Sequence, residues 1–324
     1  MPRWKTKVGD YYQKLSATGG VVVAEGRTGE VHALDARTGD VLWKRKAENE
    51  SHTLDGAVYL SNPIRPWLTA VDASSGETRW RGDFSAVVNM AVAGSVVCFG
   101  YEGPTTAVGV RDGRTRWSAD VPPELGLAAD SRVVVAAGPR SLVGLDPRGG
   151  RERWTSALRL RHAPPLAAFL VGAGLVFIGA DDGVLHAVRA DDGSPVWRKG
   201  HAQRWFNGSS LKLSGGVLYA DSGYGTVVAM DAATGAERWS RPVGEGGHDL
   251  ALSGGTLFAA STRTRTVLAL DTADGRVRWS HRARVGTWSG PDGTDGVVGA
   301  GGLVFLSTRE GDVEAVGGGA GAGS

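Results

Sequence analysis

The side chains of this sequence best suited to proton transfer are three histidines, His52, His162 and His248, because imidazole titrates near neutral pH. Asp249 directly follows His248 and could accept or orient its proton. A metal shared by the three imidazoles would need each ring nitrogen within about 2.1 Å of the ion, which residues so far apart in a chain rarely achieve. We therefore expect no metal site. An acid–base enzyme acting on a small molecule is one of two functions that these residues allow.

A second set of side chains suits binding rather than catalysis. Trp67, Trp205 and Trp288 stand outside the regular tryptophan spacing described below, so that spacing gives them no packing role. Aromatic and polar residues gathered on one face are typical of a binding surface. The candidate partner-binding residues are Tyr11, His52, Trp67, Tyr101, His162, Trp205, Asn207, Tyr224, His248 and Trp288. Binding of a protein or peptide is therefore the other function, and the same face could also hold a small-molecule ligand.

Two further features, the single cysteine and a cluster of arginines, say less about function. Cys98 is the single cysteine, so the chain has no internal disulfide, and its apolar neighbours indicate a core residue. Arg263, Arg265, Arg282 and Arg284 form a local basic patch. This patch is either ordinary solvated charge or a surface that recognises an acidic peptide or ligand.

Charge and hydropathy exclude several classes of protein. Lys plus Arg (36) nearly balance Asp plus Glu (34), and a net charge of +2 gives no broad field for nucleic acid. No run approaches the roughly 18 apolar residues of a membrane span, and the first residues lack the apolar run of a signal peptide. As the chain stands we expect a cytoplasmic protein, or an extracytoplasmic one if it is excised from a larger exported protein.

Internal repeats determine the expected fold. Fifty glycines and eleven tryptophans favour short strands and tight turns, and tryptophans recur 37 to 43 residues apart. A period in this range indicates a solenoid or a propeller. The copies are Ala33–Trp43, Ala70–Trp80, Gly144–Trp154, Ala187–Trp197, Ala229–Trp239 and Ala269–Trp279, with Gly109–Trp117 as a copy shortened by two residues.

Each copy predicts the same local structure. Residues 216–220 and 226–230 are apolar or alternating runs typical of two paired strands. Asp231 can then accept backbone hydrogen bonds across the next turn, and Gly235 can adopt a positive φ. The turn leads into a strand that carries Trp239, whose large ring can pack between neighbouring sheets. We therefore interpret the repeated Asp and Trp residues as structural.

The two ends of the chain supply the last sheet. The tryptophan of an eighth copy would fall one residue beyond Ser324, whereas Arg3-Trp4-Lys5 resembles the missing strand and Trp4 lies 39 residues before Trp43. We predict an all-β, eight-bladed propeller of four-stranded blades, in which the strand around Trp4 joins the C-terminal blade and leaves no open edge. The propeller should span residues 1–316 as one domain, with 317–324 as a flexible Gly/Ala-rich tail.

The Ala-x-Asp-x-x-x-Gly-x-x-x-Trp copies resemble the repeats of the pyrroloquinoline-quinone-like (PQQ-like) β-propeller family over essentially the whole chain. That family includes quinoprotein alcohol dehydrogenases, an outer-membrane β-barrel assembly factor and the C-terminal propellers of some actinobacterial Ser/Thr kinases. The dehydrogenases are longer, and many have a pair of adjacent cysteines beside the quinone that one cysteine cannot supply. The resemblance therefore implies the fold without a quinone, and we expect no cofactor.

Together these observations favour a non-catalytic, monomeric propeller that binds a protein or peptide through its aromatic and His-rich face. The alternative is an enzyme whose acid–base site, drawn from His52, His162, His248 and Asp249, lies in the central funnel of that face.

Overall fold

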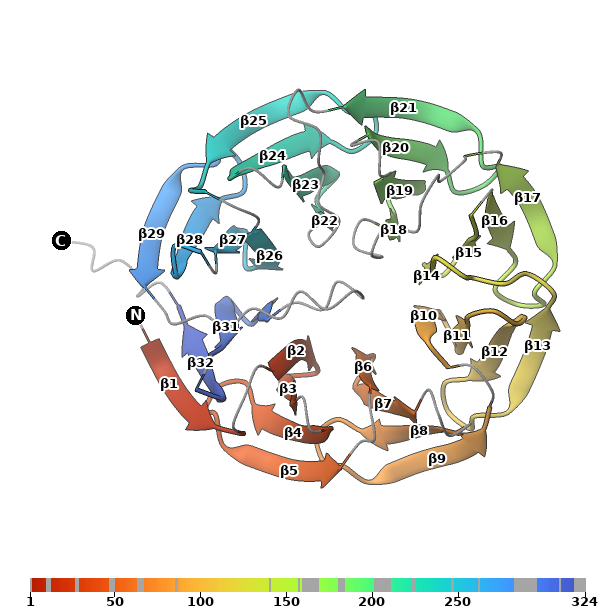
Figure 1. The fold of residues 1–324 in the computed structure, drawn as a ribbon, viewed down its shortest axis with the longest axis horizontal. Helices are drawn as coiled ribbons and strands as arrows, with labels where there is room; N and C mark the ends of the chain where they lie inside the picture. The colour runs from red at the N-terminus through yellow and green to blue at the C-terminus, as the bar shows by residue number, and fades with distance from the viewer. Residues whose placement is uncertain are drawn as a thin grey trace.

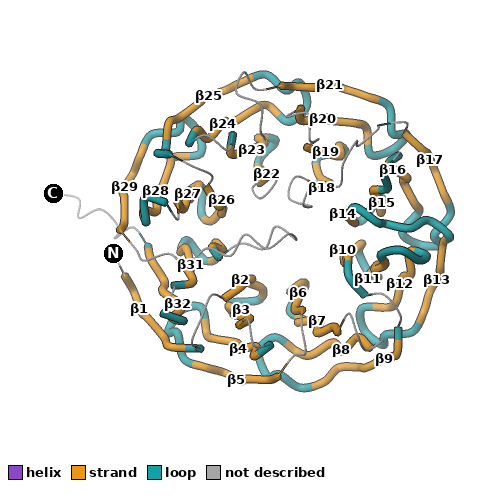
Figure 2. Tube along the Cα trace, in the orientation of Figure 1, coloured by secondary structure: helices purple, strands orange, loops and turns teal. Residues whose placement is uncertain are grey.

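Eight four-stranded sheets stand around a central axis as the blades of a propeller (Figure 1). The structure is a computed structural model that describes residues 2–9, 13–26, 29–46, 50–62, 67–84, 87–139, 141–156, 158, 169–179, 184–200, 211–222, 225–245, 248–261, 263–282, 296–308 and 310–317. These residues contain thirty-two strands and no helix (Figure 2), hence no helix that could cross a membrane. The predicted fold is confirmed.

Seven blades contain four consecutive strands each, ordered from the axis outward. Blades 1 to 3 are β2 (Gln13–Thr18), β3 (Val21–Gly26), β4 (Glu30–Asp35), β5 (Val41–Lys46); β6 (Glu50–Leu54), β7 (Ala57–Asn62), β8 (Trp67–Asp72), β9 (Thr78–Asp83); and β10 (Asn89–Ala93), β11 (Val96–Gly100), β12 (Thr105–Gly109), β13 (Thr115–Ala119). Blades 4 and 5 are β14 (Gly126–Ala129), β15 (Val134–Ala137), β16 (Leu142–Leu145), β17 (Glu152–Ser156); and β18 (Phe169–Gly172), β19 (Leu175–Gly179), β20 (Val184–Arg189), β21 (Pro195–Gly200). Blades 6 and 7 are β22 (Leu211–Ser214), β23 (Val217–Asp221), β24 (Thr226–Asp231), β25 (Glu237–Pro242); and β26 (His248–Ser253), β27 (Thr256–Ser261), β28 (Thr266–Asp271), β29 (Val277–Arg282).

The eighth blade is built from both ends of the chain. It contains β30 (Val297–Ala300), β31 (Leu303–Ser307), β32 (Asp312–Val316) and, outermost, β1 (Pro2–Lys7). Figure 1 shows β1 beside β32 at the rim of the ring. Trp4 pairs with Ala315, and its ring packs 5.6 Å from that of Phe305. Lys5 forms an ion pair with Asp312 at 2.8 Å. The predicted closure by the strand around Trp4 is confirmed.

Burial along the strands follows their distance from the axis. The second strand of a blade is covered by neighbouring blades on both faces, so β11, β19, β23 and β27 are buried at every residue. The outermost strands β1, β5, β25 and β29 have a largely exposed, alternating pattern because only one face packs inward. The core therefore consists of apolar clusters between successive blades rather than one central cluster.

The antiparallel order gives the propeller two different ends. The turns between the first and second strands lie beside those between the third and fourth strands, as the hydrogen bond from the Ala232 N–H to the Gly216 carbonyl shows. We call this end the turn face. The opposite end, the loop face, carries the loops between the second and third strands and the crossings from blade to blade.

The Asp-x-x-x-Gly turns fold as predicted. Asp231 Oδ1 accepts hydrogen bonds from the backbone N–H groups of Ala233 and Thr234 at 3.1 and 3.0 Å, and Gly235 has a φ of +69°. Arg238 donates to Asp231 Oδ2 at 2.8 Å. This bond and those within the turn hold the pKa of the Asp231 carboxyl below its usual range. The aspartates are therefore structural groups of the turn.

The repeated tryptophans join each blade to the next. Trp197 donates from Nε1 to the Ala232 carbonyl of the following blade at 3.0 Å. A Cβ atom built on Gly235 would lie 2.8 Å from the Trp197 ring, so the turn glycine is required both by its φ and by the ring against it. The same bond to the next blade, at 2.8 to 3.1 Å, is made by Trp4, Trp43, Trp80, Trp117, Trp154 and Trp239.

The copy in blade 3 is not shortened, and this expectation was wrong. Ala107 pairs with Trp117 in the register found in the other blades, and Gly109 takes the place of the aspartate. A Cβ on Gly109 would clash with the Asp112 carboxylate and would lie 2.5 Å from Arg116 Nη2. The Asp112 carboxylate therefore occupies the space beside Gly109, and both of its oxygens bind Arg116 at 2.9 Å. The aspartate has moved within a turn of unchanged length.

Glycine at the Trp contact should be far less replaceable than glycine elsewhere in the same blade. Gly235→Ala should lower the free energy of unfolding by about 3 kcal/mol, because a positive φ and a clash with Trp197 act together. Gly216→Ala has a similar φ of +73° but no heavy atom within 4 Å of its Cβ, and should cost about 1 kcal/mol. Urea denaturation of the two variants measures the difference, and equal losses would contradict it.

The closing strand should matter more than the tail. Removal of residues 1–7 deletes β1, exposes the edge of β32 and removes the Trp4 contacts, so the thermal midpoint and the solubility should fall. Removal of residues 318–324 is the matched control and should change both much less. Equal midpoints for the two truncated proteins would show that β1 does not stabilise the ring.

Candidate functional site

Five of the predicted site residues lie in the described part of the chain. Four of them lie toward the loop face, whereas His52 is the middle residue of β6. His52 lies in β6, His248 and Asp249 begin β26, Trp67 begins β8, and Tyr101 directly follows β11. The other candidates, which lie outside the described residues, are Tyr11, His162, Trp205, Asn207, Tyr224 and Trp288. The structure therefore places four of the ten residues of the predicted binding surface, together with Asp249 of the predicted acid–base set.

Trp67 has a packing role that its irregular position in the sequence did not indicate. Its half-buried ring packs against the apolar cluster between blades 1 and 2. The Arg81 guanidinium lies 5.1 Å from the ring centroid, a distance at which a cation is attracted to the π-face. Trp67 thus combines a core contact with a contact to a cation.

His248 is paired with an aspartate that sequence reasoning missed. Its Nδ1 lies 3.6 Å from Asp221 Oδ1, and these side chains are 1% and 0% exposed. Asp221 Oδ2 also accepts a hydrogen bond from the backbone N–H of His248 at 3.1 Å. Asp221 ends the second strand of blade 6 and His248 begins the first strand of blade 7, so the pair links two blades beneath the loop face.

Glu25 makes the corresponding link between blades 1 and 2. Its Oε2 accepts hydrogen bonds from the backbone N–H and the hydroxyl of Ser51 at 2.7 and 2.6 Å, all buried. Glu25 and Asp221 occupy the same position of the repeat, near the end of the second strand. An acid closing an otherwise apolar strand was the available sequence signal for both.

The imidazoles and Asp249 are not gathered into one acid–base site by the described residues. His248 faces blade 6, and Asp249 points to the opposite side of β26 because successive residues of a strand alternate. His52 lies in blade 2, whereas His248 lies in blade 7. Within the described residues no three His, Cys, Asp or Glu side chains are placed to hold a metal ion.

The other groups that the sequence singles out are Cys98 and the arginines of the predicted basic patch. Cys98 is buried, as expected, and burial raises the pKa of its thiol to about 12, so the reactive thiolate is absent near neutral pH. In the predicted basic patch, Arg263 lies 3.5 Å from Glu245, with both side chains largely exposed. Arg265 and Arg282 are exposed, and Arg284 lies outside the described residues.

The Asp221 link should contribute measurably to stability. Asp221→Ala removes the acceptor of a buried N–H and should lower the free energy of unfolding by about 1–3 kcal/mol, whereas Asp221→Asn keeps an acceptor and should lose less. The control is Asp274→Ala, which removes an exposed ion pair with Arg276 and an exposed hydrogen bond from its backbone N–H, and should lower the free energy of unfolding less. Chemical denaturation checks the order, and a stability of Asp221→Ala equal to that of the control would contradict it.

Solved structures with this architecture include proteins of different activity. The computationally designed Ika8 protein aligns with a TM-score of 0.77 and 16% identity over 97% of this chain and 98% of its own. BamB from Moraxella catarrhalis aligns with a TM-score of 0.71 and 16% identity over the same shares. The quinohemoprotein alcohol dehydrogenase ADHIIG from Pseudomonas putida aligns with a TM-score of 0.64 and 17% identity, over 98% of this chain and 72% of its own. At these identities the likeness shows the fold alone.

The sequence itself identifies the family. No curated protein matches it. A family model described as outer membrane protein assembly factor BamB matches residues 27–160, 102–247 and 225–318, which together span most of the chain and seven of its tryptophan repeats. The chain belongs to this family of PQQ-like repeat propellers.

Proposed function

We propose that this propeller is a non-catalytic scaffold that binds a protein or peptide on its loop face, with Tyr101 as an anchor. The observation that carries the proposal is the contrast in exposure between two kinds of group. Tyr101 is 38% exposed and Glu102 beside it is also exposed. His248 and Asp221 are almost completely buried, where no substrate can reach them.

Tyr101 is displayed by a rigid part of the loop face. A Cβ on the preceding Gly100 would lie 2.9 Å from the Pro104 carbonyl and 3.0 Å from Pro123, so the backbone is tightly enclosed. Asn89 Nδ2 donates to the Pro123 carbonyl at 2.7 Å, and Thr105 Oγ1 donates to the Val121 carbonyl at 2.6 Å. An aromatic side chain held on a fixed backbone loses little entropy on binding, which is typical of interface anchors.

The family supports the same function. The matching model is described as an assembly factor, and such a factor acts on other proteins. The acid–base alternative would need a histidine and a carboxylate that both meet a cavity, whereas the described pair of this kind is enclosed between blades 6 and 7. A binding role for the loop face agrees better with what its side chains expose.

The test is selection of ligands from a phage-displayed library of random dodecapeptides on the immobilised protein. We expect selected peptides to bind Tyr101→Ala at least about tenfold more weakly than the wild type, because an aromatic anchor is lost. Val277→Ala is the matched control, since Val277 is 49% exposed on β29 away from the loop face, and it should bind as the wild type does.

Two outcomes would contradict the proposal. One is a set of peptides whose affinity is the same for Tyr101→Ala and the wild type. The other is turnover of a small molecule that His52→Ala or His248→Ala abolishes in a folded protein, which would favour the acid–base enzyme. Trp205→Ala and Trp288→Ala extend the test, because both should keep the fold and weaken binding, whereas Trp239→Ala should lose about 3–5 kcal/mol of stability.

A further inference from the structure

The turn face has an uneven distribution of charge. In blades 3 and 4 its segments 94–95, 109–116, 130–132 and 146–153 carry more arginines than carboxylates. The corresponding segments of blades 1, 2, 5 and 6 carry more carboxylates than basic residues, and those of blade 7 carry equal numbers. The basic residues of blades 3 and 4 are Arg111, Arg114, Arg116, Arg132, Arg148, Arg151 and Arg153, and the acidic residues are Asp112, Asp130, Asp146 and Glu152. We call these seven arginines the arginine patch.

Three of the four carboxylates of this region are already used within the turns, and Glu152 Oε1 accepts a hydrogen bond from the Thr155 hydroxyl at 2.8 Å. Asp112 binds Arg116, and Asp146 binds Arg153. Asp130 Oδ1 accepts hydrogen bonds from the backbone N–H groups of Arg132 and Val133. No carboxylate of the described residues lies within 4 Å of the other guanidinium groups, which are all exposed: Arg111, Arg114, Arg132, Arg148 and Arg151.

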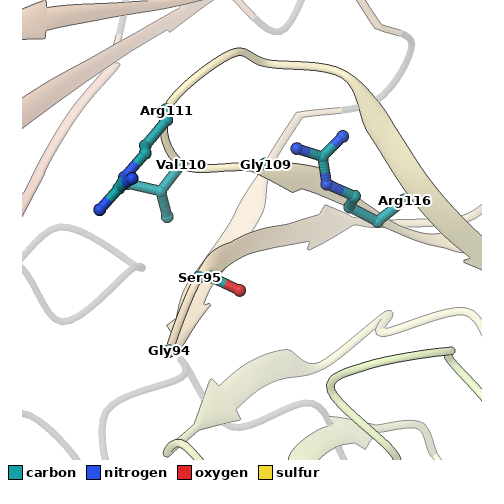
Figure 3. A pocket seen from close by; sticks show the side chains of 6 residues that line it. All are labelled: Gly94, Ser95, Gly109, Val110, Arg111 and Arg116. Carbon is teal, nitrogen blue, oxygen red and sulfur yellow. The ribbon is translucent and has the colours of Figure 1, made fainter.

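The patch covers two adjacent blades and contains a pocket. Blades 3 and 4 are joined by the hydrogen bond from Trp117 Nε1 to the Pro147 carbonyl, at 2.8 Å. A pocket of about 380 Å³ in blade 3 is lined by Gly94, Ser95, Gly109, Val110, Arg111 and Arg116. Figure 3 shows Arg111 and Arg116 on opposite sides of the turn, with the hydroxyl of Ser95 on the hairpin beside it. The pocket thus has one guanidinium that holds a carboxylate and one that does not.

The same turns show which chemistry the patch prefers. Arg116 holds both oxygens of Asp112 at 2.9 Å, and bidentate binding of a planar carboxylate is the characteristic geometry of a guanidinium. The Arg116 bonds and the hydrogen bond from the backbone N–H of Arg114 hold the pKa of the Asp112 carboxyl below its usual range. A carboxylate brought by a partner would meet the same donors on five further arginines.

We propose that the arginine patch on the turn face of blades 3 and 4 is a second interaction surface, which binds an acidic peptide segment of a partner protein. Two features favour such a peptide over nucleic acid. The four segments contain no aromatic residue on which a base could stack, and the surrounding blades are neutral or acidic on this face. The patch lies at the end opposite to Tyr101, so the inference is independent of the proposed function.

The test measures binding of a fluorescein-labelled peptide made of Gly-Glu-Asp repeats by fluorescence anisotropy. Binding should weaken as salt is added, because exposed charges are screened. The variant carrying Arg111→Glu, Arg148→Glu and Arg151→Glu should bind at least about tenfold more weakly. All three side chains are exposed, so its thermal midpoint should stay close to that of the wild type.

The matched control carries Arg37→Glu, Arg189→Glu and Arg276→Glu, three exposed arginines in turns of blades 1, 5 and 7. It changes the net charge equally and should bind the peptide within about twofold of the wild type. Tyr101→Ala should also leave this binding unchanged. An equal loss in the control would show that only net charge matters and would overturn the proposal. So would absence of peptide binding, or tighter binding of an oligothymidylate or of phosphatidylserine vesicles than of the peptide.

Discussion

The contact of one tryptophan with the turn of the following blade is the interaction on which the ring depends. The indole fills the gap between two sheets, its N–H is bonded to a carbonyl of the next blade, and its ring lies against a glycine that has no Cβ. Each part needs the others: the glycine permits both the turn and the approach of the ring, and the aspartate holds the turn in place. A blade is therefore not an independent unit, because the tryptophan of its last strand needs the turn of the next blade to pack against.

This dependence explains how much could be predicted from the sequence. Blade number, strand order and closure through Trp4 follow from spacing, because the tryptophan and the turn glycine recur at the same distance from each other in successive repeats. The links from Asp221 to His248 and from Glu25 to Ser51 could not be predicted in this way. In the described part of the chain they join blades 6 and 7 and blades 1 and 2, and each connects residues 26 or 27 positions apart. The role of Trp67 was missed for a similar reason, since its cation partner Arg81 lies outside the repeated motif.

Blade 3 shows that the repeat preserves an interaction rather than a residue position. The sequence motif breaks at Gly109, yet the turn keeps its length, and a carboxylate from Asp112 reaches the same space and the same arginine. Motif comparison reads such an exchange as a deletion because it compares letters at fixed positions. The packing constraint is satisfied by any residue that places a carboxylate beside the guanidinium, which leaves the sequence of the turn free to vary and to acquire the excess of arginine found there.

The pairing of β1 with β32 has a consequence for how the molecule can come apart. A linear array of repeats has two ends, and each end repeat has only one neighbour, so loss of structure can start there and spread. In a closed ring every blade has two neighbours, and no blade can separate without breaking two interfaces at once. The two ends of the chain meet inside blade 8, between its third strand β32 and its fourth strand β1, where the other blades have a turn. The interfaces between blades are therefore continuous around the whole ring, and opening it at any of them costs the same kind of contact.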